Sequence, residues 1–209
     1  MTNAAAQTGI FGDWNFSQPH PTQDTDLLQQ LPFLPGLKEL LMLRQVHALE
    51  HGTVWVLSET AQSHSNPVSP YTVDNETLGG VSTEQGFYLY GDINPTHLGG
   101  AVQTALRRFR AGEWDLAIHP RCGTNFSVAV LLTTGMVMGS HLFFPKILLA
   151  QLLGLGVAAT TAAQIAPDVG KLAQKYLTTS IPFNLELEGI SEATDLWGRP
   201  ALFVRVRWI

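Results

Sequence analysis

Hydrophobic residues are most concentrated in the C-terminal half of the chain, in two nearly continuous stretches. Residues 126–144 carry no ionised side chain when His141 is neutral, and residues 147–166 carry none at all. A helix rises 1.5 Å per residue, so about 20 such residues match a hydrocarbon core of roughly 30 Å. Pro145-Lys146 separates the stretches and suits a tight turn. The pattern predicts a transmembrane helical hairpin over 126–166.

Small residues in these stretches favour a close approach of helices. Gly135 and Gly139 have the GxxxG spacing in the first stretch, and Gly154 and Gly156 lie in the second. Such residues let helices pack tightly in lipid. The alternative is a hairpin buried in a soluble helical domain, but helices of that kind are usually shorter and carry a polar stripe. The pattern therefore favours the membrane.

Basic residues are placed unevenly around the two stretches. The connection between them carries Lys146 alone, whereas the outer flanks carry Arg107, Arg108, Arg110, Arg121, Lys171 and Lys175. Lys and Arg concentrate on the cytoplasmic side of membrane proteins. We therefore expect an integral membrane protein with both termini in the cytoplasm, and the lipid bilayer and other membrane proteins as partners.

The rest of the chain predicts an α+β fold, with a small cytoplasmic α/β domain beside the hairpin. Residues 1–35 are polar and contain several prolines, which predicts a flexible tail. Apolar residues recur every 3.6 positions over 37–59, which predicts a helix. A second helix is expected from Thr96, as its N-terminal cap, to Gly112. Its expected apolar face consists of Leu98, Val102, Ala105, Leu106 and Phe109.

Short strands are expected around these helices. Residues 87–90 and 114–118 are strand-like, and polar residues with two prolines predict a loop over 61–75. Residues 184–190 and 201–208 alternate apolar and polar side chains, which predicts a C-terminal β-hairpin. The expected organisation is a tail (1–35), a cytoplasmic metal-site domain (36–125), the hairpin (126–166) and a cytoplasmic C-terminal segment (167–209).

Composition excludes several classes of protein. Charged residues make up 14% of the chain, against about 25% in typical globular proteins. The net charge of −5 gives no reason to expect nucleic acid as a partner. The single cysteine, Cys122, excludes an internal disulfide. The polar N-terminus lacks the basic and apolar regions of a signal peptide.

The first candidate site is the HxxEH motif formed by His47, Glu50 and His51 in the predicted helix. Residues four apart lie on one helical face, so the two histidines can direct ring nitrogens at one ion. Glu50 lies beside them and can act as a base on water, as in the inverted zincin motif. The motif supplies two zinc ligands and needs a third from elsewhere.

A second motif, HPRCGTN at 119–125, supplies further ligand types just before the first hydrophobic stretch. A lone histidine is more often a hydrogen-bonded neutral residue, and a lone cysteine is more often a small buried apolar residue. Two clusters of ligand-type side chains in one domain favour a metal. The predicted zinc ligands are His47, His51, His119 and Cys122.

The order of several segments resembles that of a known family. These segments are RQVHALEHGTVWVLSE, GFYLYGD, AGEWDLAIHPRCGTN, the two hydrophobic stretches and LAQKYLTTS. The chain resembles a family of uncharacterised integral membrane proteins, a domain of unknown function best populated in cyanobacteria. The resemblance covers about 37–180 and implies a two-span membrane protein with a cytoplasmic domain rich in His, Glu and Cys. It implies no known reaction.

Two function classes remain open. In a membrane-anchored zinc hydrolase of the peptidase type, three histidines bind zinc and Glu50 is the catalytic base. Thr124 or Asn125 then donates a hydrogen bond to the developing oxyanion. In a structural or scaffolding site, Cys122 is a fourth ligand and leaves no position for water. The residues alone slightly favour the structural site.

Overall fold

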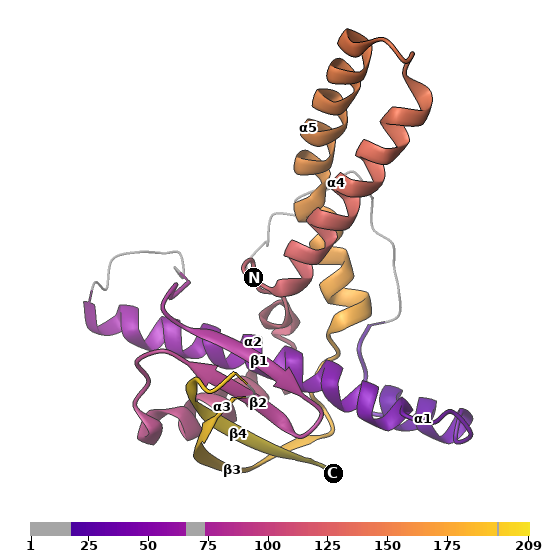
Figure 1. The fold of residues 1–209 in the computed structure, drawn as a ribbon. Helices are drawn as coiled ribbons and strands as arrows, with labels where there is room; N and C mark the ends of the chain where they lie inside the picture. Colours follow the sequence, from indigo (N-terminus) through magenta and orange to yellow (C-terminus); the bar gives the residue numbers. More distant parts are fainter. Residues whose placement is uncertain (1–17, 66–73, 196) are drawn as a thin grey trace, which may run out of the picture.

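The computed structural model describes residues 18–65, 74–195 and 197–209, with an α/β body at the base of a long helical hairpin (Figure 1). The body contains α1 (Gln23–Gln30), α2 (Leu37–Ser65), α3 (Pro95–Arg110), the 3₁₀ helix η1 (Trp114–Ala117), β1 (Gly79–Thr83), β2 (Gly86–Tyr90), β3 (Leu185–Thr194) and β4 (Pro200–Trp208). The hairpin consists of α4 (Gly123–Phe143) and α5 (Leu148–Ala173), which continues into the π-helical turn η2 (Gln174–Thr178). The mixture of helices and one sheet confirms the α+β class.

The four strands form one antiparallel sheet in the order β1-β2-β4-β3. The predicted C-terminal hairpin is present as β3 and β4, and β4 also pairs with β2, where Phe87 lies opposite Val204. Sequence patterns missed β1, because its Gly79-Gly80 pair is typical of a turn. The strand expected at 114–118 is wrong. Residues Trp114–Ala117 form η1, because this segment packs against α2 instead of beside a strand.

The core lies where α2 and α3 pack against each other and against the sheet. The predicted apolar face of α3 is buried and consists of Leu98, Val102, Ala105, Leu106 and Phe109. A Cβ atom on Gly52 would stand 2.6 Å from the Phe109 ring, so glycine permits this close contact of α2 with α3. The cap of α3 is Asn94, whose side chain accepts from the N–H of Thr96 at 3.0 Å. Thr96 is therefore inside the helix and is not its cap.

Part of the segment expected to be a flexible tail is helical. Within α1, Asp24 is buried and accepts a hydrogen bond from Nε2 of Gln45 at 2.5 Å, which joins α1 to α2. The expected tail residues 1–17 lie outside the described residues. Helix α2 runs into the segment expected to be a loop, because no proline occurs in it before Pro67. Residues 66–73 of that expected loop also lie outside the described part of the chain.

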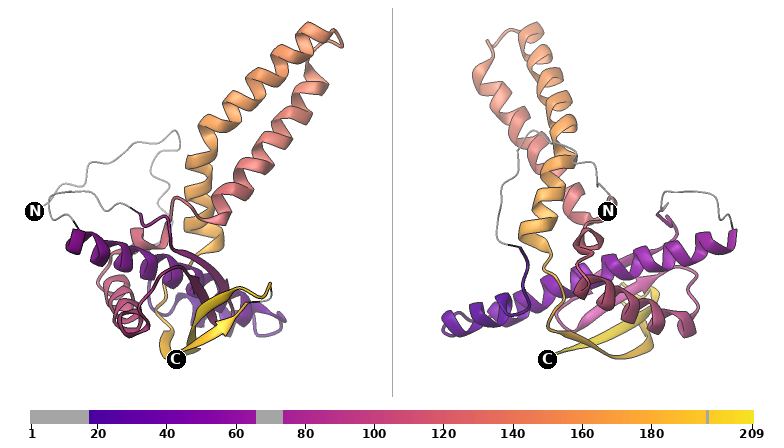
Figure 2. Two further views of the ribbon diagram at one scale, coloured as in Figure 1. Left: turned by 60° about the vertical axis from the view of Figure 1, so that its left-hand side comes forward. Right: turned by 180° about the vertical axis from the view of Figure 1, so that it is seen from behind.

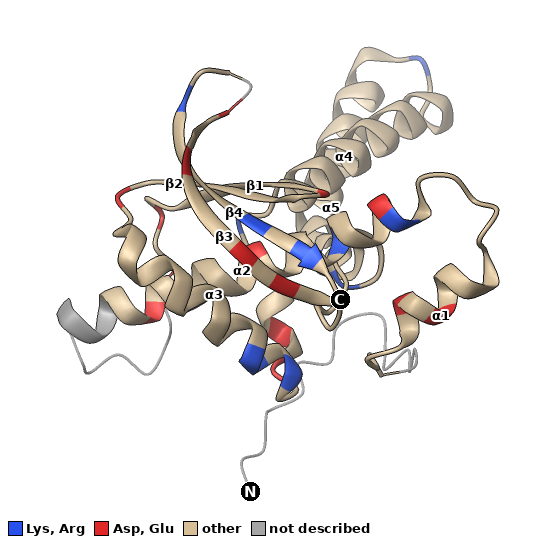
Figure 3. Ribbon diagram, turned by 90° about the horizontal axis from the view of Figure 1, so that it is seen from below, with Lys and Arg blue, Asp and Glu red and all other residues tan. Residues whose placement is uncertain are grey.

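Helices α4 and α5 are long and apolar enough to cross a membrane, judged by length and composition. No residue of α4 is buried, and large apolar side chains on both helices are exposed. Both views in Figure 2 show the pair projecting from the body, and Figure 3 shows it almost free of charged segments. The two helices are therefore not the covered core of a soluble domain.

Small residues on α5 form its buried side, at every fourth position: Gly154, Ala158, Ala162, Ala166 and Gly170. A Cβ atom on Gly154 would stand 2.8 Å from the Phe144 ring, so a larger residue would push the hairpin apart near its tip. Gly135 and Gly139 do not take part in the contact between α4 and α5. Added Cβ atoms at these two positions would have nothing within 4 Å, because that face of α4 is not covered by α5.

Candidate functional site

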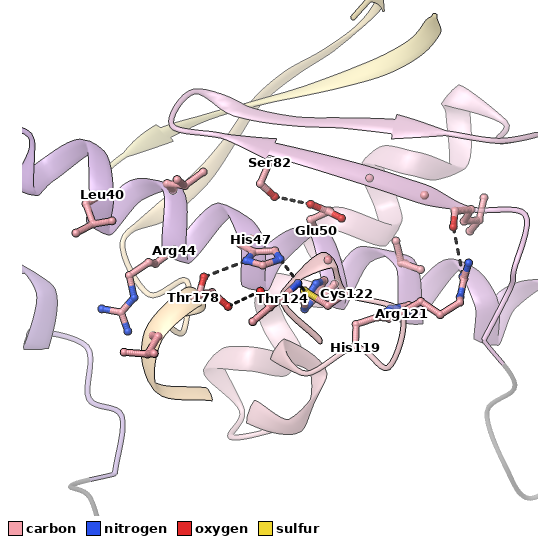
Figure 4. Close-up of a pocket in the computed structure, with 18 residues that line it drawn as sticks. Leu40, Arg44, His47, Glu50, Ser82, His119, Arg121, Cys122, Thr124 and Thr178 are labelled. Carbon is pink, nitrogen blue, oxygen red and sulfur yellow. Dashed lines mark hydrogen bonds between the residues drawn. The ribbon is translucent and has the colours of Figure 1, made fainter. Parts of the chain in front are cut away.

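The polar residues of the HxxEH motif lie along α2, and Cys122 meets them from the start of α4 (Figure 4). One ring nitrogen of His47, one of His51 and the Sγ atom of Cys122 all lie within 4.8 Å of one another. The Sγ atom is 3.3 Å from Nε2 of His47, and the two imidazole centroids are 4.4 Å apart. Three ligand atoms this close together can hold one metal ion.

A backbone carbonyl orients each imidazole of this group. Nδ1 of His47 lies 3.0 Å from the carbonyl oxygen of Thr178, and Nδ1 of His51 lies 2.7 Å from that of Ala117. A carbonyl oxygen only accepts hydrogen bonds, so each Nδ1 carries a proton, and the neutral form of each imidazole has its lone pair on Nε2. Metal-binding histidines are commonly oriented in this way. In their neutral form, both histidines therefore have an Nε2 lone pair that could bind a metal, and Nε2 of His47 already contacts the sulfur of Cys122.

Cys122 is buried and caps the N-terminus of α4, where its sulfur accepts from the N–H of Thr124 at 3.4 Å. Burial by itself raises the pKa of the thiol. The hydrogen bond and charge of His51, together with hydrogen bonds from Thr124, outweigh it and lower the pKa overall. The thiolate is the form that binds metals. The surroundings of Cys122 therefore favour its role as a ligand.

His119 lies against the three-residue group but is not a member of it within the described residues. Its Nε2 is 3.2 Å from Oδ1 of Asp74, and its ring centroid is 5.4 Å from that of His51. Burial, together with the charge of His51, lowers the pKa of His119 to about 4, although Asp74 opposes this shift. Arg121 also donates to Asp74 at 2.9 Å and holds it in place. The structure thus brings together three of the four predicted ligands.

Glu50 is buried on the side of the site formed by β1 (Figure 4). The hydroxyl of Ser82 donates a hydrogen bond to its carboxylate. Burial raises the pKa of Glu50, and the Ser82 hydrogen bond and the charge of His47 offset only part of this effect. A Cβ atom on Gly80 would collide with the Glu50 carboxylate, so glycine makes room for it. Ser82 and Gly80 of β1 therefore hold the carboxylate of Glu50, the predicted base, in a defined position.

One cavity of about 550 Å³ is lined by all the candidate site residues, which are His47, Glu50, His51, His119 and Cys122. Beside the ligand group, its lining includes the cationic side chains of Arg44 and Arg121. Leu40, Leu43 and Leu177 also line it and are exposed to solvent, so they form an apolar rim. The carboxylate of the HxxEH motif is the one carboxylate among the described lining residues. The cavity combines a group that could hold a metal ion, one buried carboxylate and a solvent-exposed rim.

The two expected oxyanion donors have different positions. Thr124 lines the cavity, and its hydroxyl lies 3.0 Å from that of Thr178. The side-chain amide of Asn125 donates to the carbonyl of Pro120 at 2.8 Å and accepts from Gln174 at 2.7 Å. Asn125 therefore holds the loop before α4, and only Thr124 is placed to contact a molecule in the cavity.

Comparison with known proteins identifies the family. The family described as "Domain of unknown function (DUF6391)" matches residues 42–190. The chain belongs to this family. An uncharacterised protein of Picosynechococcus sp. (strain ATCC 27264 / PCC 7002 / PR-6) is 55% identical over 197 residues, which is 94% of each chain. No solved structure matches the chain. The expected resemblance to a family of unknown function with a cyanobacterial member is confirmed.

The DUF6391 region contains every candidate site residue, whereas α1 and β4 lie outside it. Sequence patterns missed the residues that position the site: Asp74, Gly80, Ser82, Ala117 and Thr178. Two of these act through backbone carbonyls, which any residue type supplies, so they leave no signal in the sequence. The Gly79-Gly80 pair was the one available signal, because paired glycines often mark a close approach to the backbone.

Proposed function

We propose that this DUF6391 protein is an integral membrane protein with a zinc hydrolase site at the base of its hairpin. One observation carries the proposal: ligand atoms of His47, His51 and Cys122 lie within 4.8 Å of one another and share a cavity with Glu50. Two imidazoles and a thiolate suit zinc. Catalytic zinc sites typically have three protein ligands and one open position.

Each side chain then has a defined role. A zinc ion held by the two histidines and the cysteine supplies a Lewis acid. Glu50 is the general base that takes a proton from the attacking water, since no other described carboxylate lines the cavity. The hydroxyl of Thr124 is positioned at the cavity wall to donate to a developing oxyanion.

A structural zinc site is the second candidate, and the position of Cys122 supports it. A metal bound there would join α2 to the N-cap residue of α4 and so fasten the hairpin to the body. That site needs His119 as its fourth ligand. Nε2 of His119 is instead 3.2 Å from Asp74, and a cavity adjoins the three remaining ligands. The geometry therefore supports the hydrolase better, although the sequence alone slightly favoured the structural site.

The membrane part of the proposal rests on the uncovered surface of α4 and α5 and on the placement of charge. Lys146 stands alone at the tip, while Arg121, Lys171 and Lys175 lie at the end of the hairpin next to the body, and Arg107, Arg108 and Arg110 lie in α3 of the body. Positive charge favours the cytoplasmic side. Both termini are then cytoplasmic, the membrane is a plasma or thylakoid membrane, and the lipid bilayer is the first partner.

The hairpin predicts a specific behaviour in membranes. The protein is expected to stay in the membrane pellet during extraction with alkaline carbonate, because its two apolar helices have no other cover. Reporter proteins fused to Met1 and to Ile209 should both report the cytoplasmic side. Recovery as a soluble monomer without detergent, or reporters on opposite sides, would contradict the hairpin.

The ligand group predicts about one zinc ion per purified chain, measured by elemental mass spectrometry. Cys122→Ser is expected to lose most of the metal, because it removes one of three ligands. His119→Ala is the matched comparison and is expected to keep it, since His119 bonds to Asp74. Equal loss of zinc from both variants would indicate a four-ligand site and contradict the three-ligand hydrolase.

A further inference from the structure

The free edge of β1 runs along the cavity that holds the candidate metal group. β1 is the outermost strand of the sheet, so one edge pairs with β2 and the other pairs with no strand among the described residues. Gly79, Gly80 and Ser82 of this strand line the cavity, and Figure 4 shows the strand passing beside Glu50. A strand edge with unpaired backbone groups therefore forms one wall of the site.

The pairing of β1 with β2 identifies which backbone groups are free. The two-residue turn at 84–85 closes on the pair Thr83–Gly86. In such hairpins the closing pair exchanges hydrogen bonds, and bonded and non-bonded pairs then alternate along the ladder. The N–H and C=O groups of Gly80 and Ser82 therefore point away from β2 and toward the open edge.

Arg121 donates to backbone carbonyls just before β1, among them that of Leu78, but the strand itself lacks the features that usually block edge strands. Natural proteins protect such edges with charged residues, proline or bulges, and the sequence of β1, Gly-Gly-Val-Ser-Thr, has no charged residue and no proline. Ser82 donates a hydrogen bond to Glu50, and Gly80 lies against the same carboxylate. A chain paired with β1 would therefore pass beside the proposed base.

We propose, as a deepening of the hydrolase function on which it rests, that the substrate is an extended polypeptide that adds a strand to β1. Paired strands lie about 4.8 Å apart, and their backbone hydrogen bonds give affinity for many sequences. Water adds to the carbonyl carbon of the peptide bond, and Glu50 takes the proton of the water and passes it to the amide nitrogen. The C–N bond then breaks, which leaves one carboxylate and one amine.

The apolar rim indicates which polypeptides fit. Leu40, Leu43 and Leu177 are 54%, 37% and 71% exposed, and they line the cavity beside the first residues of α4. Contact with apolar side chains of a substrate would remove this surface from water. We therefore expect cleavage next to apolar residues, close to the membrane surface. A phospholipid could contact the same rim, but it has no backbone groups to pair with β1.

The test compares Ser82→Pro with Ser82→Ala in the full-length, zinc-loaded protein in detergent micelles. Both variants lose the hydroxyl, but only proline also lacks the N–H at the free edge, and proline is tolerated at such an edge. The probes are fluorescein-labelled β-casein, an unfolded polypeptide, and p-nitrophenyl acetate, an ester without a peptide backbone. For casein, kcat/KM should be about tenfold lower in Ser82→Pro than in Ser82→Ala, as for one lost hydrogen bond. For the ester, the two variants should be equal.

Equal casein cleavage by the two variants would overturn binding at the edge. Release of fatty acid from phosphatidylglycerol vesicles without cleavage of casein would also overturn it, but would keep the hydrolase. Failure of the wild type on all three probes would overturn the hydrolase itself. If Ser82→Pro unfolds, Gly79→Lys and Gly79→Ala replace the pair, since an added Cβ at Gly79 meets nothing within 4 Å. Only lysine should then reduce casein cleavage, and equal rates would again overturn the proposal.

Discussion

Replacing Glu50 with glutamine is expected to abolish hydrolysis while zinc and the fold are retained. The amide has nearly the same size as the carboxylate and can accept the hydrogen bond from Ser82, but it cannot take a proton from water. Loss of a general base typically lowers kcat by about 10²–10⁴-fold. The measurement is the rate with p-nitrophenyl acetate and casein, together with zinc content and the thermal midpoint. Ser82→Ala is the control, because it removes the neighbouring hydroxyl and keeps the base.

A structural site gives the opposite outcome for the same variant. Glu50 would then orient an imidazole, and Glu50→Gln would weaken metal binding by about 10–100-fold and lower the thermal midpoint. Loss of both zinc and stability would therefore contradict the hydrolase. Retention of both, with hydrolysis gone, would contradict the structural site.

Withdrawal of zinc is expected to lower the thermal midpoint of the wild type strongly. A ligand that binds only the folded state at about 1,000 times its Kd stabilises that state by about 4 kcal/mol. For a chain of this length, each kcal/mol shifts the midpoint by about 2–4 °C, so the expected change is about 8–16 °C. The measurement is thermal unfolding in detergent with EDTA and after zinc is restored.

Two matched histidine variants test whether stabilisation by zinc depends on the candidate ligand group. His51→Ala removes a ligand of the group and should abolish the response to zinc. His97→Ala removes a histidine from the first turn of α3, outside the group, and should respond like the wild type. A full zinc response in His51→Ala would contradict its role as a ligand.

Local patterns predicted much of the fold, because they depend on neighbours in the sequence. The apolar face of α3 and the long apolar helices α4 and α5 follow from periodicity and length. The HxxEH motif placed His47 and His51 on one helical face for the same reason, and their rings are adjacent in the structure. The alternation in the C-terminal segment correctly predicted β3 and β4.

Long-range partners were less predictable. Cys122 reaches His47 across 75 positions of sequence, and no local pattern separates it from His119, which instead bonds to Asp74. The strand β1 was missed because glycines disfavour isolated strands, and it forms here only beside β2. Side-chain partners and edge strands of this kind depend on the packed fold, where burial and strand pairing outweigh the local preferences of the residues.

The contact between His47 and the carbonyl of Thr178 has a consequence for biosynthesis. The ribosome makes α2 first, then both apolar helices, and only afterwards the residue that orients the first imidazole. The nascent chain thus carries both histidines of the HxxEH motif long before their surroundings exist. The complete geometry of the candidate metal group can form only after α5 has returned to the body, so maturation of the site must follow synthesis of the whole hairpin.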